Sequence, residues 1–214
     1  MDRQSLVAYF RKRTQDEQAA PLWSDEEIWQ YIREAELAAG ACKLIYDKSS
    51  ALCSIPAVDG QSSYAIDPLF YEIELVYIDG KSIRAIDRED FIRRNVSLPK
   101  GSVGGYFIDE DGSLVFDRPP PDSALEIKIA GWRYPLPMTA DDSACEIPEQ
   151  WQIKMLEWAF YLAKQKEDPQ TERPADAAKH YATFEQYFAP MRSATQLSRQ
   201  QKTTKRYQTK YGSL

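Results

Sequence analysis

Hydrophobic residues in this chain recur with the period of a helix at both ends and with the period of a strand in the middle. After Ile28 and again after Trp151, apolar side chains are spaced three to four residues apart, which is typical of amphipathic helices. Between these regions, residues 71–78 alternate between polar and apolar side chains, as expected for a half-buried strand. Helices on both sides of a strand block favour a helical bundle that carries an inserted β domain.

The N-terminal region predicts two helices. The first is expected over residues 3–13, and Pro21 lies in the loop that ends it. Ser24 and Glu27 form a capping-box pattern, which marks the start of the second helix. Because small and apolar residues continue at helical spacing beyond that point, we expect this second helix to extend to about Ser49.

Two hairpins and a further strand are expected in the middle of the chain. The dipeptide Asp79-Gly80 separates two alternating runs, which is a strong signal for a two-residue β-hairpin turn. Asp87 can cap a short helix that continues to Arg94. A second hairpin is expected over residues 105–116, and residues 125–130 alternate as another strand. Together these segments predict an antiparallel meander of about five strands.

The helical period returns after Pro148, which suits the first position of a helix. Apolar residues on two faces of this helix predict a central position in the bundle; they are Trp151, Ile153, Met155, Leu156, Trp158, Ala159, Phe160 and Leu162. A final helix is expected over residues 174–188, with Ala177, Tyr181, Phe184 and Phe188 as its apolar stripe. Pro190 should end or kink this helix, because proline donates no backbone hydrogen bond.

The predicted fold class is α+β: an antiparallel helical bundle with two N-terminal and two C-terminal helices, an inserted antiparallel β domain and an extended C-terminal arm. The expected boundaries are 1–50 for the N-terminal helices, 51–146 for the β domain, 147–190 for the C-terminal helices and 191–214 for the basic arm. A chain of 214 residues is long enough for one large or two small domains of this kind.

Composition and the lack of long apolar runs restrict the cellular compartment and the kinds of partner that we expect for this chain. The pI near 5.0 argues against nucleic acid as the main partner of the globular body. No stretch is long and apolar enough to span a bilayer, and no N-terminal run resembles a signal peptide. The three cysteines are an odd number without metal-like spacing, so we expect free thiols in a reducing compartment. These features predict a protein made in cytoplasm that remains there or travels in a particle assembled there.

Residues 192–214 differ in charge from the rest of the chain. They carry a formal charge of +6 and contain no Asp or Glu, so that the remainder of a chain with net charge −6 stands at −12. This segment also contains few apolar residues, so it cannot bury a core of its own. Three interpretations follow from composition: an unstructured solubilising end, a nucleic-acid-binding tail, or a segment that orders on an acidic partner surface with Tyr207, Tyr211 and Leu214 as apolar anchors.

No motif indicates a catalytic, metal or cofactor site. His180 is the single histidine, and no motif supplies it with a nucleophile or an orienting carboxylate. The acidic turn 109–112 lacks the longer loop of an EF-hand, and the glycine-rich run 101–105 lacks the Lys-Ser/Thr of a phosphate loop. We therefore predict a structural histidine and small buried thiols at Cys42, Cys53 and Cys145.

Four ordered pieces of the sequence resemble the head-to-tail adaptor family of tailed bacteriophages, whose members are also called connector or head completion proteins. The pieces are Trp-Ser-Asp-Glu-Glu-Ile at 23–28 with Tyr-Ile-Arg-Glu-Ala at 31–35, the hairpin at 76–84, the strand and prolines at 112–120, and the helix start at 146–149. Their order covers most of residues 1–190. The β insertion is most similar to that of adaptors from short-tailed phages.

The resemblance implies a non-enzymatic structural protein of the virion, located at the head–tail interface after assembly in the host cytoplasm. Such proteins form a ring, usually of twelve copies, that completes the head and extends the DNA channel. The implied partners are the portal, tail proteins of the nozzle or tail-completion type, neighbouring copies, and genomic double-stranded DNA that passes without sequence recognition; no membrane or cofactor is implied.

The resemblance also implies a role for the tail, because the C-terminal segment of these adaptors commonly clasps the portal. The predicted portal-binding residues are Arg192, Arg199, Lys202, Lys205, Arg206, Tyr207, Lys210, Tyr211 and Leu214. The alternative function is a nucleic-acid-binding accessory protein that uses the same basic tail.

Overall fold

The fold was obtained as a computed structural model, which describes residues 1–18, 20–94, 101–122, 125–166 and 173–208. The chain divides into two compact units. Met1–Ile45 and Tyr134–Leu214 form a helical unit, and Tyr46–Arg133 form a β unit that contains strands β1 to β8. The β unit is therefore inserted in the sequence between the two parts of the helical unit.

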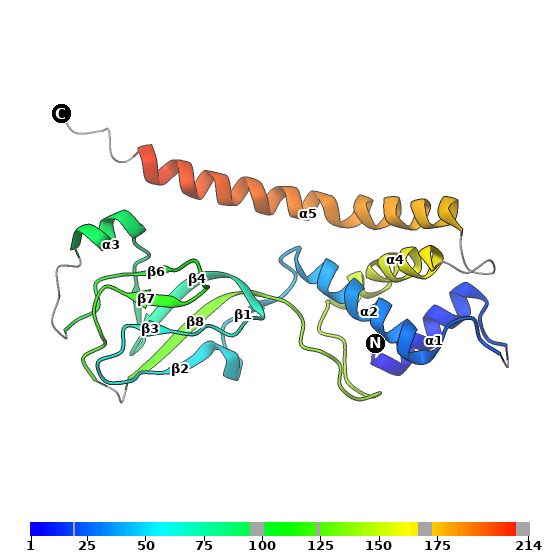
Figure 1. The fold of residues 1–214 in the computed structure, drawn as a ribbon, viewed down its shortest axis with the longest axis horizontal. Coiled ribbons are helices and arrows are strands. Elements are labelled where there is room, and N and C mark those ends of the chain that lie inside the picture. The colour runs from blue at the N-terminus through cyan, green and yellow to red at the C-terminus, as the bar shows by residue number, and fades with distance from the viewer. Residues whose placement is uncertain (19, 95–100, 123–124, 167–172, 209–214) are drawn as a thin grey trace. The chain divides into compact units, whose positions relative to one another are not determined.

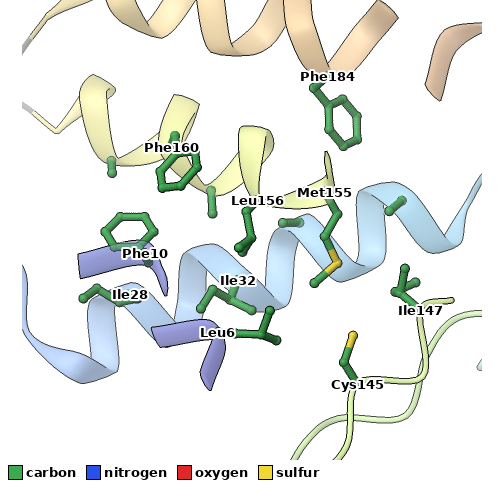
Figure 2. Packing of buried hydrophobic residues seen from close by; sticks show 14 of the residues in the cluster. Leu6, Phe10, Ile28, Ile32, Cys145, Ile147, Met155, Leu156, Phe160 and Phe184 are labelled. Atoms are coloured by element: carbon green, nitrogen blue, oxygen red, sulfur yellow. The ribbon is translucent and has the colours of Figure 1, made fainter. Parts of the chain in front are cut away.

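Four helices make up the helical unit: α1 (Arg3–Thr14), α2 (Asp25–Gly40), α4 (Glu149–Gln165) and α5 (Pro174–Gln208). Helix α4 contacts α1, α2 and α5 and lies between α2 and α5 (Figure 1). The core holds fully buried side chains from all four helices, among them Leu6, Phe10, Ile32, Leu156 and Phe184 (Figure 2). Ile153, which the sequence placed on one of the two apolar faces of α4, is 48% exposed. In the part of the chain that the structure describes, no helix has the length and apolar character needed to cross a bilayer.

The predicted capping box begins α2. The side-chain oxygen of Ser24 accepts a hydrogen bond from the backbone N–H of Glu27 at 3.2 Å, and the Glu27 carboxylate accepts from the N–H of Ser24 at 2.9 Å. The helix ends at Gly40, so the expected extension to Ser49 is wrong. Asp47 accepts hydrogen bonds from the N–H groups of Ser49 and Ser50, and such local side-chain bonds compete with a helix.

A buried carboxylate fixes the loop between α1 and α2. Asp16 is 3% exposed and accepts hydrogen bonds from the N–H groups of Leu22 and Trp23 and from the guanidinium of Arg11. The same guanidinium donates to the carbonyl oxygen of Trp23 at 3.1 Å. Asp16 and Arg11 thereby satisfy backbone groups of Leu22 and Trp23, and the side chain of Trp23 is buried in the core.

Helix α5 continues through Pro190 to Gln208, so the predicted end at Pro190 is wrong. Residues 191–208 have helical backbone in place of the expected extended arm (Figure 1). Pro190 and Gln186 are both exposed, so water can hydrate the carbonyl group of Gln186 that loses its N–H partner. The proline therefore costs one hydrogen bond at the surface and does not interrupt the helix.

The β unit contains two antiparallel sheets. One has the order β1-β8-β4-β5 with β2 also paired to β8, and the other has the order β3-β7-β6. The strands are β1 (Tyr46–Asp47), β2 (Ser54–Pro56), β3 (Ser63–Tyr64), β4 (Phe70–Ile78), β5 (Lys81–Ile83), β6 (Tyr106–Ile108), β7 (Leu114–Phe116) and β8 (Glu126–Arg133), and the helical segments are η1 (Ala51–Cys53) and α3 (Arg88–Arg94).

Both predicted hairpins are confirmed, but the single meander is wrong. Strands β4 and β5 flank a turn in which Asp79 and Gly80 have φ angles of 49° and 70°, as a primed hairpin turn requires. Strands β6 and β7 pair as expected. Strand β8 pairs with β4, β1 and β2, which places the last strand in the interior of its sheet. Strands β1 to β3 have only two or three residues each, too few to show a period in the sequence.

An ion pair joins the strands by which the chain enters and leaves the β unit. The carboxylate of Asp47 on β1 lies 2.6 Å from Nε of Arg133 on β8, and their side chains are 7% and 6% exposed. Burial by itself would raise the pKa of Asp47, but the hydrogen bonds from Arg133 and from the backbone of Ser49 and Ser50 hold it well below its usual range. The two ends of the unit are thereby fastened to each other.

Candidate assembly surface

The backbone of α5 determines where the predicted portal-binding residues stand. Arg192, Arg199 and Arg206 are seven residues apart on a continuous helix, so they share one side of it, since seven residues make nearly two turns. Lys202 stands three residues after Arg199, close to the same side, whereas Lys205 stands on another. The helix therefore gathers four of the predicted cations into one row.

Of the predicted tail residues, the structure describes the side chain of Arg192. Its guanidinium pairs with the carboxylate of Glu185, two turns earlier in α5, so this residue is engaged within the chain. Arg199, Lys202, Lys205, Arg206 and Tyr207 lie where the structure describes only the helical backbone. Lys210, Tyr211 and Leu214 lie outside the described residues.

The part of α5 after Met191 is nearly all polar. Met191 packs against the core of the helical unit, but beyond it only Leu197 and Tyr207 are large apolar residues in the helical stretch. Most helical stability in proteins comes from the packing of an apolar face, and the sequence of this stretch has no apolar stripe. This segment therefore has the composition of a helix that needs another surface to stabilise it.

His180 belongs to a contact between α5 and α4. Its Nδ1 lies 2.7 Å from the Glu157 carboxylate, and its ring packs against Phe160. An orienting carboxylate is therefore present; the sequence could not reveal it, because the partner stands 23 residues away on another helix. The cavity beside His180, about 200 Å³ in volume, is lined by one hydroxyl group, that of Thr14, which already donates to the carbonyls of Phe10 and Arg11. This geometry supports a structural role.

The three cysteines are free, buried and engaged with different neighbours. The thiol of Cys145 lies 3.4 Å from the Glu36 carboxylate, and that of Cys53 lies 3.3 Å from Asp47. Burial raises the pKa of Cys42 to about 11 and that of Cys145 to about 12. Within the described ranges, no group of three His, Cys, Asp or Glu residues is arranged to hold a metal ion. The predicted burial of the thiols is confirmed.

Sequence reasoning missed the buried carboxylate of Glu36. This side chain on α2 is fully buried, lies 3.1 Å from Arg33, and accepts from the thiol of Cys145. Burial raises its pKa, although the hydrogen bond and charge of Arg33 act in the opposite direction. Arg33 also donates to the carbonyl of Pro135 at 3.0 Å. Glu36 thus ties α2 to the returning chain, and no local sequence signal marks it.

Helices α4 and α5 form an open aromatic groove, about 500 Å³ in volume, on the helical unit. The ring of Tyr161 lies 5.2 Å from that of Tyr181, and Trp158 lies 5.4 Å from Tyr161 and 6.0 Å from Tyr181. Tyr181 was expected in the core stripe of its helix, but it is 41% exposed. The groove therefore presents aromatic surface that the described part of the chain leaves uncovered.

Comparison with known proteins identifies one family. The profile of a family described as SU10 adaptor protein matches residues 1–208. The match covers the β unit, the described helices of the helical unit and the helical part of the basic tail. No curated protein matches the chain.

Proposed function

Because the chain belongs to the SU10 adaptor protein family, a family of phage head–tail adaptors, we propose that it is a non-enzymatic structural protein that joins the portal of a filled head to the tail. The observation that carries this proposal is the family match over residues 1–208. The fold is compatible with it: the helical unit has a well-packed core, and the basic end of α5 lacks a hydrophobic face.

In this proposal, copies of the chain form a closed ring, of twelve subunits, beneath the portal, and the ring lengthens the channel through which the genome passes. The charge of the chain supports a channel role. Residues 1–191 carry a formal charge of −12, and an acidic wall repels the DNA phosphates and so prevents the genome from sticking. The lower face of the ring receives the nozzle or tail-completion proteins.

The basic end of α5 docks on the portal. Arg199, Lys202 and Arg206 stand close to one side of the helix, so they can meet an acidic strip on the portal together. Fixing this polar segment costs conformational entropy, which lowers the affinity of a single arm. A ring of arms bound to a ring of portal subunits recovers affinity through multivalency.

Deletion of residues 192–214 tests the docking step. We expect the shortened chain to keep hydrogen-exchange protection in α4 and β8, because no core stripe runs through the deleted segment, and to lose cosedimentation with purified portal. A matched variant, Arg199→Gln/Lys202→Gln/Arg206→Gln, keeps the length and removes the row of charge. Portal binding by the shortened chain equal to that of the full chain would show that the arm does not dock.

The alternative, a nucleic-acid-binding accessory protein, is favoured by the same row of cations. A salt titration of binding to duplex DNA separates the two functions. A tail that grips DNA gives a steep, sequence-independent decrease of affinity with salt, whereas the adaptor binds portal and shows no such affinity for DNA.

A further inference from the structure

Helix α5 changes character around Pro190, where its packed part meets its basic part. Before this point, Phe184 and Phe188 are fully buried and hold the helix on the core of the helical unit. Among the side chains that the structure describes, Met191 is the last one of α5 that packs against this core. The direction in which the basic part leaves the helical unit is therefore set within the turns on either side of Pro190.

Pro190 weakens the helix at this junction. It offers no N–H to the carbonyl oxygen of Gln186, and prolines are a common cause of sharp bends in helices. The 16 residues 193–208 follow it as helix and span about 24 Å. A bend of only about 20° at Pro190 would displace the far end of this stretch by about 8 Å. Straightness at this one point therefore decides where the basic residues are presented.

An ion pair crosses the weak point. The carboxylate of Glu185, in the turn before Pro190, pairs with the guanidinium of Arg192, in the turn after it. Their side chains are half-buried, at 29% and 37% exposure. Because seven residues make nearly two turns, the two residues share one side of the helix, and the planar guanidinium gives a more fixed geometry than an ammonium group would. The pair links the two turns that Pro190 separates.

We propose that Arg192 is a positioning residue, whose pair with Glu185 keeps the basic end of α5 in line with its packed part. This inference deepens the proposed docking of the basic end on the portal and rests on it. It changes the role predicted for Arg192 from a portal contact to the orientation of the segment that makes the contact. A segment whose direction is already fixed loses less conformational entropy when it binds.

A distance measured within α5 of the full chain tests the proposal without portal. Spin labels are attached at Ala182→Cys, an exposed position before Pro190, and at Thr203→Cys. In a straight helix, 21 residues separate the two Cα atoms by about 32 Å. We expect electron–electron resonance to give one narrow distribution. Arg192→Gln or Glu185→Gln should broaden it towards shorter distances. The native thiols are buried, and the unaltered chain, as the control, should take up no label.

Three matched variants separate the ion pair from a general effect of charge. The exchange Glu185→Arg/Arg192→Glu restores the pair in the opposite sense and should restore the narrow distribution. Pro190→Ala returns an N–H partner to the carbonyl of Gln186, so Arg192→Gln in that background should leave the distribution narrow. Arg199→Gln removes another cation from the same side of the helix without breaking the pair and should leave the distribution unchanged.

Binding to purified portal distinguishes orientation from direct contact. Arg192→Gln should weaken the affinity about threefold, a size expected for one partly exposed ion pair. The exchange variant and Pro190→Ala/Arg192→Gln should both recover it. If Arg192 contacted the portal itself, the exchange variant would bind no better than Arg192→Gln, because it places a carboxylate at the contact.

Either of two results would overturn the inference: a distribution in Arg192→Gln as narrow as that of the unaltered chain, or failure of the exchange variant to recover portal affinity. Failure of the unaltered chain to bind portal would contradict the adaptor function instead. In that case the distance measurement, which needs no portal, still decides whether the Glu185–Arg192 pair holds the helix straight.

Discussion

Replacement of Asp47 by alanine is expected to destabilise the β unit strongly. The carboxylate of Asp47 and the guanidinium of Arg133 are 2.6 Å apart, with side chains 7% and 6% exposed. Removing one partner of a buried ion pair leaves the other charge without compensation and costs about 3–5 kcal/mol. Asp47 also accepts hydrogen bonds from the N–H groups of Ser49 and Ser50, so its loss frees the turn that leads into η1.

Hydrogen exchange measured on peptides of β4, β8 and α4 is the appropriate assay, because a chain of two units need not unfold in a single step. In Asp47→Ala, protection should fall in β4 and β8 and remain in α4. The double variant Asp47→Ala/Arg133→Ala should be less destabilised than the sum of the two single variants, because it leaves no unpaired buried charge. Asp176→Ala, which breaks the exposed pair with Lys179, is the control and should have little effect.

The same pair predicts how the β unit responds to acid. The pKa of Asp47 is held below its usual range in the folded chain, so folding favours the ionised form. This contribution is complete above the ordinary carboxyl pKa of about 3.9 and is lost as the pH falls through the lower folded value. Asp47→Ala should therefore be less sensitive to acid than the unaltered chain. If Asp47→Ala loses no more protection than Asp176→Ala, the pair does not fasten the unit and the reasoning is refuted.

Two further predictions concern the β sheet and the thiols. Gly131→Ala should lower the stability of the β unit by roughly 1–3 kcal/mol, because an added Cβ would lie 2.2 Å from the carbonyl oxygen of Glu72 on β4; unchanged exchange protection in β4 and β8 would contradict this. Cys42 and Cys145, whose pKa values burial raises to about 11 and 12, should not react with a thiol reagent such as dithionitrobenzoate at pH 8 in the folded chain, and all three cysteines should react once the chain is unfolded. Rapid labelling of either residue without denaturant would show that the helical unit opens more readily than its packing indicates.

Local signals predicted where elements begin, and they were less successful at predicting where elements end. The Ser24 and Glu27 capping box and the Asp79-Gly80 turn were confirmed because each depends on hydrogen bonds or backbone angles within four residues. The extension of the second helix to about Ser49 and the end of the last helix near Pro190 were predicted wrongly. Where each helix ends depends on hydrogen bonds made by neighbouring groups and on the exposure of the backbone to water. A helical pattern in the sequence contains neither kind of information.

The two candidate surfaces also differ in how far the sequence predicted them. Composition predicted the basic tail, and the structure showed that its helical backbone places Arg192, Arg199 and Arg206 on one side. The α4–α5 groove was not visible, because Tyr181 stands at a position that its own helix would assign to the core. Its exposure depends on how α4 packs against α5. The resemblance to phage adaptors was confirmed by the family match.

By itself, the sequence determined where the main helices begin, the longer strands, the two hairpins and the charge contrast of the tail, because these depend on neighbours along the chain. Only the tertiary structure decided that β8 pairs with β4, β1 and β2, that Asp47 meets Arg133, and that His180 meets Glu157. These contacts join residues 23 to 86 positions apart. Their stability comes from burial and pairing across elements, and no short window of sequence contains both partners.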